Sequence, residues 1–174
     1  RSKWKKNQKR GSVPKADKPR EVIQMDTVDF GQIYAFTAVD IYSKEVVVKL
    51  YQSLTASDGL DFLKYSFSSR YKHTDLLQTD GGSEFKAQFR SNVFNYANRF
   101  RVSRPYKKNE QSYIESFNRS LRKECLGWGK FQPKDIPDLE KELTDYLMYY
   151  HNKRPHLSLG LKTPNQFLDE VSDI

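Results

Sequence analysis

Three acidic residues, far apart along the chain, have types and surroundings suited to metal-dependent chemistry. Asp26 lies inside a segment of alternating apolar residues, Asp80 directly follows a short apolar segment, and Glu115 lies in a segment of helical periodicity. Carboxylates from three elements can converge to hold Mg²⁺ or Mn²⁺, hard ions that prefer carboxylate, water and phosphate oxygens. Two such ions, roughly 3.5–4 Å apart, hold the attacking and leaving oxygens of a displacement at phosphorus. The residue types therefore indicate phosphoryl transfer, although a chain with 22 acids offers many other triplets.

Each of these acids also has a plain structural explanation. Asp26 would be solvated if its strand lay at a sheet edge, whereas an acid in a central strand is costly to desolvate unless it is paired or metal-bound. Asp80 begins an Asp-Gly turn, which is common, although ligands of open α/β sheets bind beyond the carboxyl ends of strands. Glu115 would pair with Arg119 at i,i+4, for about 0.2–0.5 kcal/mol.

The first half of the sequence predicts an antiparallel meander followed by a helix. Alternating apolar residues indicate three strands joined by short turns, over residues 22–30, 33–41 and 45–51. The first strand would turn Asp26 and Val28 to one face of the sheet and Met25 to the other. Thr55 or Ser57 would cap a helix that continues to residue 70.

The second half alternates between strands and helices. We expect a short strand that ends before Asp80, helical spacing over 85–100, a strand over 100–103 and helices over 111–125 and about 139–150. Thr163-Pro164 predicts the start of a last short helix. Three strands followed by this alternation predict one mixed sheet covered by helices on both sides.

Composition limits the class of protein. The 174 residues, of 20.5 kDa, suffice for one domain with little more than a tail. No apolar run approaches the roughly 18 residues of a membrane span, and residues 1–10 hold no apolar stretch of a signal peptide. The single cysteine, Cys125, excludes an internal disulfide framework and fits a reducing compartment. With three histidines it also does not suit a zinc module.

The net charge of +8 is concentrated in the first twenty residues. Residues 1–20 hold nine Lys or Arg and one acid, and the remaining 154 residues hold 21 bases and 21 acids. We therefore expect a basic arm or linker over 1–20 and a neutral domain over 21–174. The arm is either a solvated linker, or a segment that contacts nucleic-acid phosphates or forms a hinge to a further domain.

Basic residues also cluster beside Glu115. Residues 99–108 contain five Lys or Arg and no acid, and the cluster continues along the following helix. Such a surface suits DNA phosphates, each neutralised phosphate adding roughly one unit of salt dependence to binding, although scattered bases on a solvated surface are the plainer explanation. The candidate DNA-binding residues are Arg104, Lys107, Lys108, Asn118, Arg119, Arg122 and Lys123.

Three stretches of sequence carry a family resemblance. They read TDGGSEF at 79–85, YIESFN at 113–118 and YHNKRPHLSLGLKTP at 150–164. Together they resemble the catalytic domain of DDE transposases and retroviral-type integrases, above all the bacterial insertion-sequence transposases, over residues 21–168. Glu115 follows Asp80 by 35 residues, in line with that family's second spacing.

The resemblance implies a fold, a site and a reaction. The fold would be α/β and ribonuclease H-like, a five-stranded mixed sheet with three antiparallel strands and then two parallel ones. Asp26, Asp80 and Glu115 match the three acids that serve as catalytic metal ligands for two Mg²⁺ or Mn²⁺ ions. One departure is that Asn109-Glu110-Gln111 stands where the family often has Asp-Asn-Ala, which makes Glu110 an alternative to Glu115. The activity implied is DNA cleavage and strand transfer without a covalent protein–DNA intermediate.

Two other functions fit the same residues. One is a nuclease of the same fold that cuts without joining, and the other is an inactive DNA-binding module that retains the acids. The expected partners are double-stranded DNA and further copies of the chain on that DNA, with no membrane, inside a bacterial cell in the cytoplasm or nucleoid. His151, Arg154 and His156 are interpreted as structural, with Arg154 bonding helix ends.

Overall fold

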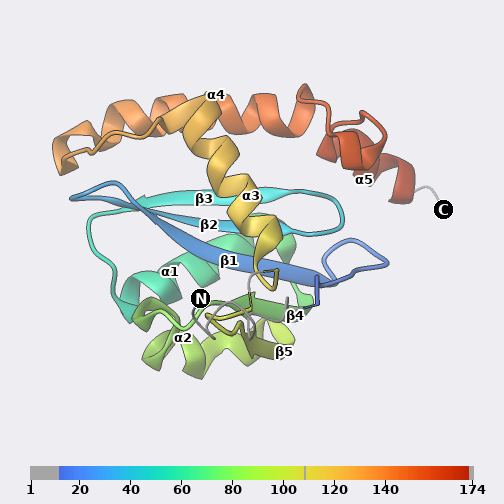
Figure 1. The fold of residues 1–174 in the computed structure, drawn as a ribbon, viewed down its shortest axis with the longest axis horizontal. Helices are drawn as coiled ribbons and strands as arrows, with labels where there is room; N and C mark the ends of the chain where they lie inside the picture. The colour runs from blue at the N-terminus through green and yellow to red at the C-terminus, as the bar shows by residue number, and fades with distance from the viewer. Residues whose placement is uncertain (1–11, 108, 173–174) are drawn as a thin grey trace, which may run out of the picture.

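A five-stranded mixed sheet forms the centre of the molecule in the computed structural model, which describes residues 12–107 and 109–172 (Figure 1). The strands lie in the order β3-β2-β1-β4-β5. Their bounds are β1 (Val22–Asp29), β2 (Tyr34–Asp40), β3 (Val46–Tyr51), β4 (Thr74–Thr79) and β5 (Ala97–Val102). β1, β2 and β3 pair antiparallel, whereas β4 pairs parallel with both β1 and β5. This confirms the predicted α/β fold.

Helices cover both faces of this sheet. α1 (Ala56–Ser66) and α2 (Ala87–Asn92) lie on one face, and α3 (Ser112–Leu121) and α4 (Ile136–Asn152) on the other (Figure 1). α5 (Pro164–Ser172) packs beside the end of α4. Short π-helical turns, η2 (Phe67–Tyr71) and η5 (Arg122–Leu126), extend α1 and α3. No helix of the described ranges is long and apolar enough to cross a bilayer.

The alternation of β1 builds two separate cores. Val22, Val28 and Phe30 are buried against α3 and α4, whereas Ile23 and Met25 are buried against α1 and α2. Successive side chains of a strand face opposite sides of its sheet, so a strand between two layers of helices can bury apolar residues on both faces. β1 is therefore the strand on which both layers of helices depend.

Side-chain caps set where two of the helices begin. Thr55 caps α1 by accepting a hydrogen bond from the backbone N of Asp58 (3.2 Å), whose carboxylate accepts one from the backbone N of Thr55 (3.0 Å). Thr163 and Gln166 make the same reciprocal pair at the start of α5. Such capping boxes satisfy backbone donors that the first turn leaves free. Both helix starts agree with the sequence prediction.

The predicted helical segment over 85–100 is partly wrong. α2 ends at Asn92, a 3₁₀ turn η4 (Val93–Asn95) follows, and β5 begins at Ala97. Ala97 pairs with Thr74 and Phe100 with Leu77 in the parallel β4–β5 ladder. Pairing with β4 thus outweighs the local helical spacing, which is a weak preference.

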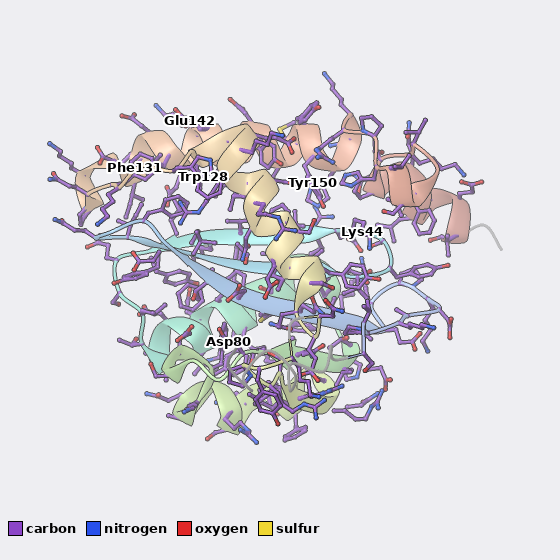
Figure 2. The ribbon with its side chains drawn as sticks, viewed as in Figure 1. Lys44, Asp80, Trp128, Phe131, Glu142 and Tyr150 are labelled. Carbon is purple, nitrogen blue, oxygen red and sulfur yellow. The ribbon has the colours of Figure 1, made fainter. Side chains whose placement is uncertain are left out.

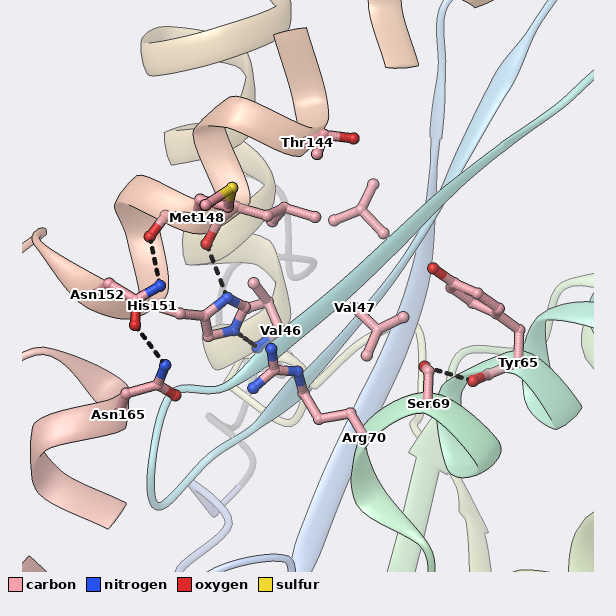
Figure 3. Close-up of a pocket in the computed structure, with 12 residues that line it drawn as sticks. Val46, Val47, Tyr65, Ser69, Arg70, Thr144, Met148, His151, Asn152 and Asn165 are labelled. Carbon is pink, nitrogen blue, oxygen red and sulfur yellow. Dashed lines mark hydrogen bonds between the residues drawn. The ribbon is translucent and has the colours of Figure 1, made fainter. Parts of the chain in front are cut away.

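A cavity of about 310 Å³ lies along the edge strand β3, between α4 on one side and α1 with η2 on the other (Figure 3). His151 of α4 closes it, because its Nε2 accepts a hydrogen bond from the backbone N of Val46 (3.1 Å) and its Nδ1 lies 2.9 Å from the carbonyl of Leu147. Burial lowers the pKa of His151 to about 4. This neutral ring has a structural role, as expected from the sequence.

Candidate active site

Asp26 lies in the middle of β1, with much of its side chain buried. Because β1 pairs with both β2 and β4, the explanation of Asp26 as a solvated residue of an edge strand is wrong. Its Oδ1 accepts a hydrogen bond from the backbone N of Thr27 (2.8 Å), and its Oδ2 accepts one from Nδ2 of Asn118 (3.0 Å). The hydroxyl of Thr37 donates to Oδ1 of Asn118 (2.8 Å), so the amide is held in this orientation. The sequence suggested Asn118 as a DNA contact, whereas its amide here orients a carboxylate.

Asp80 directly follows the last residue of β4 (Figure 2). Its Oδ1 accepts a hydrogen bond from the backbone N of Gly82 (2.9 Å), which curls the loop around the carboxylate. Gly82 has little space for a larger residue, because a Cβ there would lie 2.6 Å from both carboxylate oxygens of Glu84. The Asp-Gly turn is therefore present, and it aims Asp80 at the end of the parallel strands.

Glu115 lies in the first turn of α3, and its side chain is exposed. Two glutamines fix the start of this helix against β1. Oε1 of Gln24 accepts a hydrogen bond from the backbone N of Ile114 (3.0 Å), and Nε2 of Gln111 donates one to the carbonyl of Met25 (3.1 Å). These bonds bring Glu115 to the same end of the sheet as Asp80.

One open cavity of about 590 Å³ receives all three predicted acids. It lies beyond the carboxyl ends of β4 and β5, where open α/β sheets bind ligands. Its lining residues are Asp26, Asp80, Gly81, Gly82, Ser103, Arg104, Pro105, Lys107, Gln111 and Glu115. The sequence-predicted acids from three separate elements thus share one cavity.

The electrostatics of this cavity are unfavourable for negative charge. Burial raises the pKa of Asp26 to about 7, and the charges of Asp80, Glu115 and Glu84 act in the same direction. The hydrogen bond from the backbone N of Thr27 opposes this shift. An acid held among other carboxylates with a raised pKa is typical of functional sites.

Glu84 is the acid near this cavity that the sequence analysis missed. It lies in the 3₁₀ turn η3 (Ser83–Phe85), is buried, and accepts a hydrogen bond from the hydroxyl of Thr27 (3.1 Å). The sequence did not indicate that Glu84 lies near Asp26, because Glu84 follows two glycines that turn the chain and belongs to no strand or helix pattern. A buried Glu so close to Asp26 adds to the negative charge of the site.

Glu110, the alternative third acid, forms ion pairs with two arginines and does not line the acid cavity. It is fully buried, and its carboxylate bonds the guanidinium groups of Arg101 (2.8 Å) and Arg104 (2.6 Å) and the backbone N of Arg104 (2.8 Å). Arg104 and Arg101 together hold its pKa below the usual range against the opposing effect of burial. Glu110 therefore locks the loop after β5, and Glu115 is the acid that faces the cavity.

Six of the seven predicted DNA-binding residues lie in the described part of the chain, and two of them line the acid cavity. Lys107 and Arg104 line the acid cavity, although the guanidinium of Arg104 also bonds Glu110. Arg119 and Lys123 are exposed on α3 and η5, and Lys108 lies outside the described residues.

The side chain of Arg122 is fixed by contacts within the chain and is not free to reach a DNA phosphate. Its guanidinium lies over the ring of Phe30 (4.5 Å) and beside that of Trp128 (5.1 Å), and it donates to the carbonyl of Asp29 (3.0 Å). These contacts fix the end of β1 to the end of the α3–η5 segment.

The donor set suits a hard divalent cation by its chemistry, because three carboxylates line one cavity and the neighbouring charges that shift the pKa of Asp26 are all negative. In the described ranges, however, no three His, Cys, Asp or Glu side chains stand close enough together to ligate one ion. Asp26, Asp80 and Glu115 share the cavity without forming a closed ligand cage.

Comparisons with known proteins agree with this geometry. An integrase core domain model matches residues 16–108, and a second integrase core domain model matches residues 96–164. The chain is 22% identical to the IS150 transposase InsK of Escherichia coli over 167 residues, which cover 90% of this chain and 57% of that protein. It spans little more than half the length of the curated relatives it matches.

Solved structures show the same fold. A chain of the simian T-cell lymphotropic virus intasome in complex with PP2A regulatory subunit B56 gamma superposes with a TM-score of 0.74 at 18% identity, over 91% of this chain and 58% of that one. The catalytic core domain of BIV integrase superposes with a TM-score of 0.64 at 22% identity, over 88% of this chain and 97% of that one. The likeness to retroviral integrase cores confirms the ribonuclease H-like fold.

Proposed function

We propose that this chain, which belongs to the integrase core domain family, is the catalytic core of a metal-dependent polynucleotidyl transferase that cleaves and joins DNA. The observation that carries the proposal is the shared cavity of Asp26, Asp80 and Glu115, where burial and mutual repulsion raise the pKa of Asp26. Such a cavity favours the binding of compensating positive charge. The transposase relative supports DNA as the substrate.

Asp26, Asp80 and Glu115 would hold two Mg²⁺ or Mn²⁺ ions. When bound, such ions activate the attacking oxygen and stabilise the leaving oxygen of a displacement at phosphorus. Glu115 is exposed and lies in the first turn of its helix, so rotation of its side chain is the movement that would close the ligand set.

The other residues of the cavity have positioning roles. Asn118 keeps the Asp26 carboxylate in one orientation, and the backbone N of Gly82 does the same for Asp80. Lys107 and Arg104 place positive charge on the cavity wall, where a DNA phosphate would lie. Glu110 holds the Arg104 end of that wall in place. The reaction needs no Ser or Tyr nucleophile.

Double-stranded DNA would be the partner, with several copies of the chain assembled on it. Residues 1–20 would serve as a basic arm that contacts DNA or links to a further domain, and 21–174 would be the catalytic domain. The end of this arm is anchored on the domain, because Ala16 packs against the core and the backbone N of Arg20 donates to Asp40 (2.9 Å). We place this activity inside the bacterial cell, in the cytoplasm or nucleoid.

Metal binding tests the site on the chain itself. Titration of Mn²⁺, followed by the electron spin resonance of the free ion, should show saturable binding to the wild type and clear weakening in Asp80→Asn. Asp145→Asn, which removes an exposed acid of α4, is the control of equal charge and should bind as the wild type does.

A DNA assay tests the reaction. With Mg²⁺ and a duplex labelled at its 3′ end, the full-length protein should give a joined product, and Asp80→Asn should lower its yield at least about a hundredfold, since metal ions supply several kcal/mol. Full activity of Asp80→Asn would overturn the assignment. Cleavage without a joined product would identify a nuclease, and metal-free DNA binding without cleavage would identify an inactive binding module.

A further inference from the structure

A second polar cavity lies on the α3 and α4 side of the sheet, away from the three acids. It has a volume of about 180 Å³ and shares no lining residue with the acid cavity. The turn between β2 and β3 contributes Lys44, and the segment after α4 contributes Arg154 and His156. Three serine hydroxyls complete the polar lining, from Ser116, Ser120 and Ser158.

The nearest acids are already engaged with other groups. Glu124 forms two hydrogen bonds with Arg154 (2.7 and 2.8 Å). Asp40 accepts hydrogen bonds from the backbone N of Arg20 (2.9 Å) and from the hydroxyl of Ser43 (2.7 Å). No acid is among the described residues that line this cavity. Its polar wall therefore presents cations and hydroxyls.

His156 contributes a buried donor without an acceptor. Its side chain is about nine-tenths buried, and its Nε2 has no hydrogen-bond partner. Its Nδ1 lies 3.5 Å from Nη1 of Arg154, which can only donate. This contact favours the neutral tautomer in which Nδ1 accepts and Nε2 carries the proton. The carbonyl of Tyr150 also acts on this ring, but it forms no hydrogen bond with Nε2. A buried N–H without a partner is costly, which an anion in the cavity would remedy.

Lys44 is held in place beside this donor. Its ammonium group lies 4.1 Å from the centre of the Tyr113 ring and donates to the carbonyl of Ile41 (2.5 Å). The hydroxyl of Tyr150 donates to the carbonyl of Lys44 (2.8 Å), which ties the turn to α4 (Figure 2). The ammonium is therefore ordered at the cavity without an ion-pair partner among the described residues.

We propose that this cavity is an oxyanion site that binds a phosphate group through Lys44, the Nε2–H of His156 and the serine hydroxyls. Ammonium, imidazole and hydroxyl donors around one small cavity are the chemistry that recognises phosphate. Burial and the charges of Arg154 and Lys44 lower the pKa of His156 to about 4, although the carbonyl of Tyr150 acts in the opposite direction. A bound anion would raise this pKa.

Two sources supply such a group, a backbone phosphate of DNA and free phosphate. α3 joins the two cavities, because Glu115 faces the acid cavity and the next residue, Ser116, lines this one. The site does not rest on the proposed function, since it holds none of the three acids and needs no divalent ion.

Titration with inorganic phosphate at constant ionic strength tests the site. The imidazole signals of His156 in the NMR spectrum should shift saturably with phosphate and not with chloride, and the resonance of Nε2 should show a bound proton. Lys44→Gln should weaken phosphate binding by roughly tenfold or more, as expected for the loss of one charged hydrogen bond. Lys64→Gln, which removes an exposed charge on α1, should leave binding unchanged.

Two further variants test the site with substitutions that are expected to leave the fold intact. His156→Phe keeps an aromatic ring against Tyr150. Because it lacks the imidazole, its phosphate binding is followed by the backbone amide signals of Lys44 and Ser116, which should show no saturable shift. Ser158→Ala, at an exposed position, should weaken the shift of the His156 signals. Absence of a saturable shift, a proton on Nδ1 of His156, or equal weakening by Lys64→Gln would overturn the proposal.

A DNA arm then identifies the source. If a short duplex shifts the same His156 signals and phosphate competes with it in the wild type but not in Lys44→Gln, the ligand is a backbone phosphate. If free phosphate alone shifts them, the ligand is the free anion. Both results support an oxyanion site.

Discussion

Asp26 should make the folded protein less stable as the pH rises, and its replacement by Asn should remove that effect. Burial raises the pKa of this carboxyl from its ordinary value of 3.8 to about 7. Between these two values the folded chain binds more protons at Asp26 than the unfolded chain does, so the free energy of unfolding falls as pH rises. Below about pH 4 Asp26 is protonated in both states and does not change the free energy of unfolding. Above about pH 7 it is ionised in both states, and it lowers the free energy of unfolding by its full amount.

The size of the effect follows from the same pKa values. A change from 3.8 to about 7 corresponds to about 4 kcal/mol, at about 1.4 kcal/mol per pH unit. Asp26→Asn keeps the acceptor for the backbone N of Thr27 but sets a second amide against Nδ2 of Asn118, which costs about 1–2 kcal/mol. At pH 8 the free energy of unfolding of the variant should therefore be about 2–3 kcal/mol higher than that of the wild type. For a chain of this size, that raises the melting temperature by about 4–12 °C.

Thermal unfolding at pH 5, 6.5 and 8, with and without Mn²⁺, measures this prediction. The gain of Asp26→Asn should grow with pH, and Mn²⁺ should stabilise the wild type at pH 8 far more than the variant. Asp145→Asn, at an exposed position of α4, is the control of equal charge and should keep the pH dependence of the wild type. A variant that is less stable than the wild type at pH 8, with an unchanged pH dependence, would refute the reasoning.

Three other substitutions test the contacts around the cavity. Asn118→Ala removes the donor to Asp26 and should raise the pKa of that carboxyl further, which the pH dependence of the melting temperature would show. Glu110→Gln weakens the clamp on two arginines and should cost about 1–3 kcal/mol in urea unfolding and speed proteolysis of the loop after β5; unchanged cleavage would contradict the clamp. Gly82→Ala sets a Cβ against the Glu84 carboxylate and should cost about 1–3 kcal/mol, and a double variant with Glu84→Ala should recover most of that loss.

The placement of Asp26 could be predicted from sequence because a strand alternates strictly. Once Val28 and Met25 were assigned to opposite faces, the face of Asp26 followed, and the two cores confirm that assignment. The antiparallel meander of β1, β2 and β3 was predictable from the short turns that join these strands. The strand order, which places β4 beside β1, was not predicted. The spacing of apolar residues was therefore sufficient to predict the faces of a strand such as β1, where the alternation of side chains alone decides which residues are buried together.

Pairing between distant residues could not be predicted in this way. The bond from Asn118 to Asp26 joins residues 92 positions apart, and an Asn beside basic residues on a helix is equally well interpreted as a DNA contact. Glu84 faces Thr27 only because the Gly81-Gly82 turn reverses the chain. Likewise β5 begins at Ala97 because β4 offers it a partner, and nothing in the local spacing contains that information.

The central strand β1 links the chemistry of the site to the stability of the fold. It supplies Gln24, which holds the start of α3, and Asp26, whose charge the site tolerates poorly. Its own apolar side chains are buried on both faces, Val22 and Val28 in one core and Ile23 and Met25 in the other, so β1 cannot move away from the other carboxylates without opening a core. The repulsion is therefore relieved by a proton on Asp26 or by a cation in the cavity. A divalent ion that binds the acids should stabilise the whole domain, and its effect should vanish at a pH low enough to protonate Asp26.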